Sequence, residues 1–259
     1  MNKLDIYKNQ DYILNDAFDQ AVVNIHIQKE QNGYKTYTVC GCEPGDGSTT
    51  VAINLAAALA NSGWKTVLVD GDMRKKKGYK RLNEGASVGL SEYLTAQAQI
   101  NDIIYETTTE LLYYIPCGEQ NENPVRLLCS TQMENVEKTL ADNFDFVIYD
   151  MPAVTAAMDA TAIAVKTDAC ILVVAMGESS KKGLATAVST LDEKRANLLG
   201  VIVNKVDINE YKRYRRSFDY FKKEKYADHA KAVMKANKKN THYADRIKRT
   251  VKNGGKQIL

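Results

Sequence analysis

The chain has 259 residues, of which 44% are hydrophobic, and its formal net charge is +3. This composition allows one substantial hydrophobic core, and no apolar run leads us to expect a membrane span or a secretory signal. The five cysteines are odd in number and lack the paired spacing of metal ligands. We therefore exclude zinc and iron–sulfur sites and expect a reduced, cytoplasmic protein.

Strands alternate with helices along the chain, which predicts an α/β fold. We expect a doubly wound, mainly parallel sheet, with the intervening helices covering both of its faces. The predicted strands lie near residues 35–41, 65–70, 111–115, 145–150, 168–175 and 199–204.

A Gly-rich turn, residues 40–50, joins the first predicted strand to an Ala/Leu-rich helix and reads CGCEPGDGSTT. In this context the pattern predicts a phosphate-binding loop (P-loop), in which backbone N–H groups and the helix N-terminus replace the water around a phosphate chain. Gly45 and Gly47 would supply the conformational freedom of the turn. The predicted nucleotide-binding residues of this loop are Gly45, Asp46, Gly47, Ser48, Thr49 and Thr50.

Ser48 occupies the position at which such a loop normally carries a lysine, whereas Thr49 keeps the hydroxyl that coordinates Mg²⁺. A hydrogen bond to a charged group contributes about 1.5–3 kcal/mol, so its loss should weaken nucleotide binding roughly 10- to 100-fold. Phosphoryl transfer should fall further, because it depends on charge stabilisation in the transition state. The alternative is a Gly-rich turn with no ligand. The run of three lysines at residues 75–77 is either a solvated loop, which we favour, or a substitute cation.

Carboxylates stand at the ends of two predicted apolar strands. Asp70 and Asp72 follow the strand 65–70, and Asp150 ends the strand 145–150. Buried carboxylates at such positions are costly unless they bind something, and Mg²⁺ with a phosphate chain is the simplest partner beside a P-loop. Each of them alone could instead cap the following helix.

These motifs resemble those of the bacterial tyrosine kinases of capsular and exopolysaccharide synthesis, which are relatives of the partitioning and division-site ATPases. Residues 69–75 (VDGDMRK) look like the family's second Walker A motif, and residues 144–150 (FDFVIYD) are similar to its Walker B motif. The resemblance covers about residues 14–208. Further matching segments are 89–95, 115–118 and 199–204.

The resemblance implies a P-loop fold that binds ATP or ADP with Mg²⁺. It implies that Thr49, Asp70 and Asp150 hold the metal and its waters, and that Asn204 contacts the adenine. The catalytic residues that it implies are Asp70, Asp72 and Asp150, with one of the first two helping to deprotonate a tyrosine hydroxyl.

The resemblance also implies a partner, a membrane protein of the chain-length-determinant type whose cytoplasmic tail completes the ATP site. In the family, subunits form a ring and phosphorylate one another's C-terminal tyrosines. Here Asp19 and Val22 stand at the positions of two arginines that join those subunits, so we do not expect the ring.

Residues 205–259 carry 17 basic and 6 acidic side chains, against 18 and 26 in residues 1–204. Aromatic residues at helical spacing among these cations predict a basic amphipathic helix. Its aromatic stripe could pack on the preceding domain, dock on an anionic membrane surface or present phosphorylated tyrosines, whereas nucleic acid binding is not expected. The candidate phosphoacceptors are Tyr211, Tyr214, Tyr220 and Tyr226.

We therefore divide the chain into an N-terminal helical segment (1–34), a P-loop nucleotide-binding domain (35–208) and a basic tail (209–259). The leading hypothesis is a tyrosine-kinase-like, ATP-binding regulator of polysaccharide synthesis at the inner face of the plasma membrane, with weak or partner-dependent phosphoryl transfer. The first alternative is an inactive pseudokinase that acts as an adaptor for the membrane partner. The second is a partitioning-type ATPase.

Overall fold

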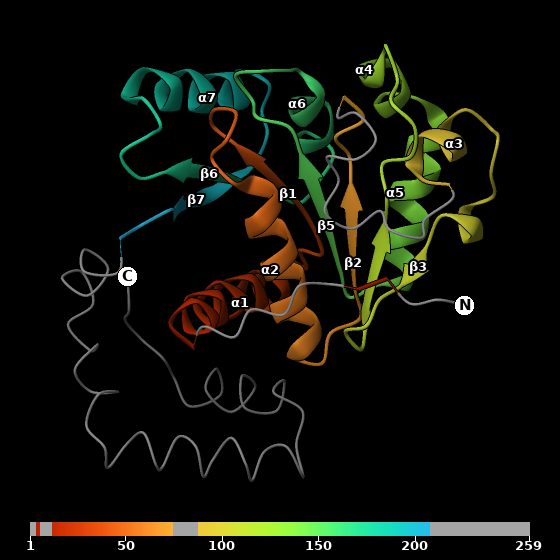
Figure 1. Ribbon diagram of the computed structural model, residues 1–259, viewed down its shortest axis with the longest axis horizontal. Coiled ribbons are helices and arrows are strands. Elements are labelled where there is room, and N and C mark those ends of the chain that lie inside the picture. The colour runs from red at the N-terminus through yellow and green to blue at the C-terminus, as the bar shows by residue number, and fades with distance from the viewer. Residues whose placement is uncertain (1–3, 6–11, 75–87, 208–259) are drawn as a thin grey trace, which may run out of the picture. The chain divides into compact units, whose positions relative to one another are not determined.

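The computed structural model shown in Figure 1 describes residues 4–5, 12–74 and 88–207. The predicted basic helix of the tail and its tyrosines Tyr211, Tyr214, Tyr220 and Tyr226 lie outside these residues, as does the lysine run at 75–77. The described elements from α1 to β7 belong to one compact unit, Met1–Asn204. The division of the chain at residues 34 and 208 stays a prediction.

The described strands form one sheet in the order β3-β4-β2-β5-β1-β6-β7. Neighbouring strands are parallel except for β3 and β4, which are antiparallel, so the predicted α/β fold with a mainly parallel sheet is confirmed. The sequence did not indicate β3, because two residues are too short for a periodic pattern. The strands are β1 (Thr36–Gly41), β2 (Thr66–Asp70), β3 (Tyr105–Glu106), β4 (Leu112–Ile115), β5 (Phe146–Met151), β6 (Ala169–Ala175) and β7 (Leu198–Asn204).

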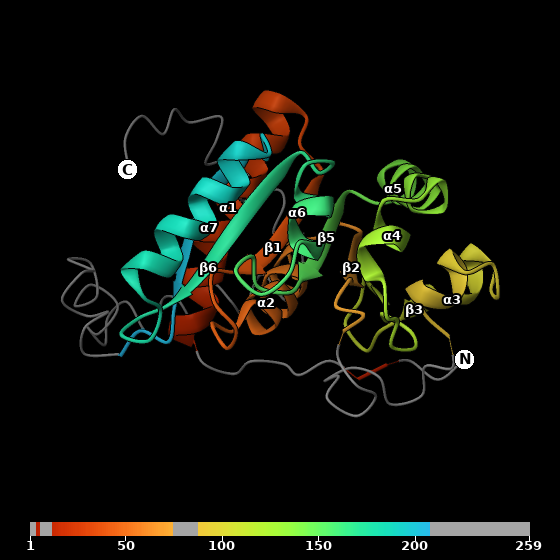
Figure 2. The same ribbon diagram turned by 90° about the horizontal axis from the view of Figure 1, so that it is seen from above.

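Helices cover both faces of the sheet, as expected for parallel strands that are buried on both sides. In Figure 2, α2 lies on one side of the central strands, and α5 and α6 lie on the other. The helices are α1 (Tyr12–Asn32), α2 (Ser48–Asn61), α3 (Leu90–Leu94), α4 (Pro124–Leu128), α5 (Thr131–Asn143), α6 (Asp159–Ala164) and α7 (Lys181–Glu193), with the 3-10 turn η1 at Ile100–Asp102.

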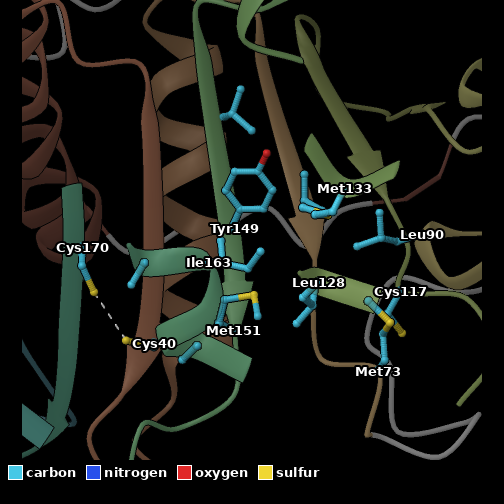
Figure 3. Close-up of a cluster of buried hydrophobic side chains, with 14 of the residues drawn as sticks. Cys40, Met73, Leu90, Cys117, Leu128, Met133, Tyr149, Met151, Ile163 and Cys170 are labelled. Carbon is cyan, nitrogen blue, oxygen red and sulfur yellow. Dashed lines mark hydrogen bonds between the residues drawn. The ribbon is translucent and has the colours of Figure 1, made fainter. Parts of the chain in front are cut away.

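The hydrophobic core on the side of α4, α5 and α6 fixes the end of β5. Tyr149 and Met151 on this strand are buried and belong to one cluster with Leu128, Met133 and Ile163 from the three helices (Figure 3). All six residues of β5 are buried. Because the strand is held on both faces, the position of its final carboxylate is set by the packing around it.

Val22 of α1 is fully buried inside this chain. By the resemblance described above, it stands at one of the two positions where the family carries an arginine that joins subunits. A buried, charged arginine without a partner would be costly here, so the valine fits the packing of α1 in this chain. This position contributes to the core and offers no cation to a neighbouring subunit.

The cysteines are all free, including the buried pair Cys40 and Cys170, whose sulfur atoms lie 3.7 Å apart (Figure 3). In the register of β1 and β6, Cys40 pairs with Leu172 and Cys170 pairs with Thr38, so the two cysteines are offset by two residues. Such a diagonal separates their Cα atoms by roughly 8 Å, beyond the reach of a disulfide. Among the described helices, none is both long and apolar enough to cross a bilayer.

Glu92 ties the short helix α3 to the loop after β4. Its buried carboxylate accepts hydrogen bonds from the backbone N–H groups of Gly89 (2.6 Å) and Glu119 (2.8 Å) and from the Ser91 hydroxyl (3.1 Å). Burial acts to raise the pKa of Glu92, but the N–H groups of Glu119 and Gly89 outweigh it, so the pKa lies below its ordinary value. The hydrogen bonds of Glu92 thus fasten the segment 89–95 to the loop that follows β4.

Replacing Glu92 with Ala is expected to lower the free energy of unfolding by about 2–3 kcal/mol, because buried N–H donors lose a charged acceptor. Since the pKa of Glu92 is lowered by folding, its contribution is present above about pH 4.3 and is lost as the pH falls further. Urea unfolding of both proteins at pH 7 and below pH 4 measures this. Glu110→Ala, at an exposed position, is the control, and a difference that stays constant with pH would contradict the expectation.

Candidate functional site

The P-loop begins where β1 ends, beside the ends of β5 and β6. Gly45 and Gly47 have φ angles of 95° and 87°, in the left-handed region that favours glycine. A side chain at Gly47 would also collide with the amide group of Asn204. The two glycines therefore allow a turn that other residues would strain, and the chain passes directly from this turn into α2.

The N-terminus of α2 directs the backbone N–H groups of its first turn toward the P-loop. Ser48 is the first residue of the helix and Gly47 is its N-cap. The first turn of a helix carries about half a positive charge and binds anions through its N–H groups. Ser48, Thr49 and Thr50 add three neutral hydroxyl side chains, so this end of the helix offers an anion no full positive charge.

Side chains behind the P-loop hold its shape. The buried carboxylate of Asp46 accepts hydrogen bonds from the Ser179 hydroxyl (2.6 Å) and from the backbone N–H of Glu43 (2.7 Å). The side-chain amide of Asn204 donates to the backbone oxygen of Asp46 at 2.8 Å. The Ser180 hydroxyl in turn donates to the Glu43 carboxylate at 2.8 Å. These contacts tie the loop to the turn after β6 and to the end of β7.

A cavity of about 540 Å³ opens in front of the P-loop. This volume lies within the range of small-molecule and cofactor sites. Asp46 and Asn204, which we predicted as nucleotide-binding residues, lie behind the loop and do not line the cavity. The predicted residues that do line it are Gly45, Gly47, Ser48, Thr49, Thr50, Asp70, Asp72 and Asp150.

Three buried carboxylates face the P-loop across this cavity. Asp70 and Asp150 are register partners at the ends of β2 and β5, with 6% and 3% of their surface exposed. Adjacent strands lie about 4.8 Å apart, so the two carboxylates start from neighbouring backbone positions. Asp72 is 7% exposed and follows two residues later. Together with the Thr49 hydroxyl they supply oxygen donors of the kind that Mg²⁺ takes beside phosphates and water.

Tyr114 of β4 also lines the cavity, and the sequence did not single it out. Its hydroxyl donates a hydrogen bond to Asp70 at 3.3 Å. Burial, followed by the negative charge of Asp70, raises the pKa of Tyr114 well above its ordinary value. The phenol therefore stays protonated near neutral pH and remains a donor that orients the Asp70 carboxylate.

The charge balance of the cavity is acidic. Among the lining residues in the described part of the chain, four are carboxylates, Glu43 and the three aspartates, and Arg74 is the only cation. The guanidinium of Arg74 is bound to Asp159, the first residue of α6. A polyanionic nucleotide would meet net repulsion here unless a divalent cation enters with it.

Sequence reasoning missed Asp159 because it lies 85 residues from Arg74 and has no motif of its own. The one available signal was Arg74 itself, two residues after Asp72 in the second Walker-like segment. The segment 152–157 also supplies apolar lining residues that no pattern indicated. They are Pro152, Ala153, Ala156 and Ala157.

Comparisons with known proteins agree with this geometry. A family model described as an AAA domain matches residues 35–205. The tyrosine-protein kinase CpsD of Streptococcus pneumoniae is 36% identical over 186 residues, which are 71% of this chain and 82% of that protein.

Two solved structures share the fold. The chimerical protein CapA2B2 has a TM-score of 0.70 and 30% identity, and the match covers 78% of this chain and 93% of that chain. The septum site-determining protein MinD from Pyrococcus horikoshii, which was solved with Mg-ADP, has a TM-score of 0.53 and 26% identity over 65% of this chain and 69% of that chain.

Proposed function

We propose that this chain, which belongs to the family of bacterial tyrosine-protein kinases, binds ATP and ADP together with Mg²⁺ in the cavity in front of the P-loop. Its phosphoryl transfer to tyrosine is weak or depends on a partner, and its biological role is to regulate capsular or exopolysaccharide synthesis. The observation that supports this proposal most strongly is the set of buried carboxylates retained around a P-loop that has no lysine.

The chemistry of the site supports nucleotide binding. The two left-handed glycines and the start of α2 offer backbone N–H groups to a phosphate chain. Thr49, Asp70 and Asp150 offer oxygen donors to Mg²⁺, directly or through its waters. When bound, Mg²⁺ neutralises phosphate charge and so offsets the acidity of the cavity. Asp70 or Asp72 is the proposed base for the tyrosine hydroxyl.

The missing lysine supports weak transfer. Phosphoryl transfer depends on positioning and on charge stabilisation of the transferred group, and Ser48 supplies no charge for the second task. Binding of the ground-state nucleotide depends less on this charge, since the backbone N–H groups and the carboxylate-held metal remain. We therefore expect binding to survive where transfer is slow.

The family relationship supports a membrane partner. We propose that a membrane protein of the chain-length-determinant type completes the ATP site with its cytoplasmic tail and draws this chain to the inner face of the plasma membrane. The basic tail, residues 209–259, would add attraction to anionic lipids. Phosphorylation of Tyr211, Tyr214, Tyr220 or Tyr226 belongs to the same proposal. Adenine contact by Asn204 would require its amide to leave the backbone oxygen of Asp46, to which it donates a hydrogen bond.

A second candidate function is that of a pseudokinase adaptor. Ser48 favours it, because a site without the phosphate-binding lysine can still bind a nucleotide without transferring its phosphate. Nucleotide binding would then serve only to signal through the structure of the protein. A partitioning-type ATPase is less well supported, since the likeness to the chimerical protein CapA2B2 is greater than that to MinD, and the sequence relative CpsD is a tyrosine-protein kinase.

One assay separates these functions. The protein is incubated with Mg²⁺ and ATP labelled at the γ-phosphate, with and without the cytoplasmic segment of the partner. Retained label is measured on a filter, and phosphotyrosine is measured after acid quenching. We expect stoichiometric retention that EDTA abolishes and little covalent label without the partner. Covalent labelling as fast as that of the Ser48→Lys variant would contradict weak transfer. No covalent label even in the presence of the partner would favour the pseudokinase adaptor.

A further inference from the structure

Arg74 is the one cationic side chain that the described residues bring to the cavity. It follows β2 closely, and 47% of its side chain is exposed. Its Nε donates to Asp159 Oδ2 at 2.7 Å, and its Nη2 donates to Asp159 Oδ1 at 2.9 Å. The side chain of Asp159 is fully buried. The arginine is thus held in one orientation by a two-point contact.

This contact leaves part of the guanidinium able to bind a second anion. An arginine has five N–H donors, and the contact with Asp159 uses two of them, so three remain. Its pKa is raised further, first by the hydrogen bond to Asp159, so the charge is permanent at any pH at which the protein is folded. A planar, charged fork at the wall of the cavity has the chemistry that recognises a phosphate group.

A polyphosphate in this cavity needs such a group, because Ser48 offers none and the carboxylates repel it. We propose that Arg74, oriented by Asp159, is the phosphate-binding cation of this site and takes over the electrostatic role of the lysine that the P-loop lacks. This inference rests on the proposed nucleotide binding. It names the residue that makes binding possible without the lysine.

A purely structural role for Arg74 predicts something different. In that case the ion pair only neutralises Asp159 and fastens the segment after β2 to α6, and the cost of removing it does not depend on what occupies position 48. If Arg74 binds phosphate in place of the lysine, its removal matters while Ser48 is present and matters much less once a lysine is restored. A double-mutant cycle measures this dependence directly.

The test uses the paired change Arg74→Gln with Asp159→Asn. It removes both charges together, because Arg74→Ala alone would leave a buried carboxylate without its partner and destabilise the fold. Affinity for Mg-ADP is measured by calorimetry in the full-length protein with Ser48 and in the Ser48→Lys variant. Lys138→Gln, at an exposed position on α5, controls for the loss of a surface cation. Thermal unfolding checks that every variant is folded.

With Ser48 present, the paired change is expected to weaken Mg-ADP binding 10-fold or more, whereas in the Ser48→Lys background the loss should be less than about 3-fold. Lys138→Gln should have no measurable effect. Equal losses in both backgrounds, or no loss in either, would overturn the role of Arg74. If the unaltered protein binds no Mg-nucleotide at all, the proposed function itself is contradicted. This result can be told apart from the two above, because in both of them the unaltered protein binds Mg-ADP.

Discussion

Asp150→Ala is expected to lower the affinity for Mg-ATP by about 10- to 100-fold, as is typical when a group that holds a metal or its waters is removed. The carboxylate lies at the end of β5, is 3% exposed and is the register partner of Asp70. Packing on both faces of the strand fixes the position of this carboxylate. Calorimetric titration with ATP at several Mg²⁺ concentrations should show that most of the Mg²⁺ dependence is lost.

Two variants control this result. Asp150→Asn keeps the shape of the side chain and removes its charge, so it should weaken binding almost as much as Ala does. Asp142→Ala, at an exposed position on α5, should leave binding unchanged. Because Asp150→Ala removes one of two adjacent buried carboxylates, the melting temperature of the nucleotide-free protein is not expected to fall. Unaltered Mg-ATP affinity in a folded Asp150→Ala protein would contradict the assigned site.

Ser48→Lys is expected to tighten Mg-ATP binding about 10-fold, at the lower end of the 10- to 100-fold range for a restored charge-assisted hydrogen bond, because Arg74 already supplies one cation. Position 48 begins α2 and lines the cavity, so a lysine there can reach the phosphates from the P-loop side. The rate of phosphoryl transfer should rise by a larger factor than the affinity, because the charge acts most strongly in the transition state.

Ser48→Met is the matched control, since it adds a long side chain without a charge. It should not raise the affinity or the transfer rate. The measurement is a single-turnover assay of phosphotyrosine formation at saturating Mg-ATP, run on the three proteins in parallel. A Ser48→Lys protein that binds more tightly but transfers phosphate no faster would mean that the block lies elsewhere, in the orientation of the tyrosine or in a missing partner.

The fold could be predicted from local patterns because each central strand carries its own signal. The apolar runs that became β2, β5 and β6 are buried along their whole length, and buried parallel strands are continuous apolar segments. Parallel pairing also explains why Asp70 and Asp150 could be placed together, since the carboxyl ends of such strands share one edge of the sheet. The two-residue strand β3 carries no such signal.

The candidate site could be predicted only where one segment supplies it. The P-loop glycines and the strand-end carboxylates are local features, whereas the contact of Arg74 with Asp159 joins residues 85 positions apart. The same limit applies to Asn204, whose amide binds the backbone of Asp46 across 158 positions. Nothing in the sequence near either residue indicates these partners, because they follow from how β2, α6 and β7 pack around the P-loop.

This P-loop is proposed to bind a magnesium nucleotide without its lysine. Calorimetric titration of the unaltered protein with ATP, once with Mg²⁺ and once with EDTA, tests this binding. We expect saturable one-to-one binding in Mg²⁺ that disappears in EDTA, because the acidic cavity admits the polyphosphate only with a divalent cation. No heat of binding in either condition from a folded protein would contradict it.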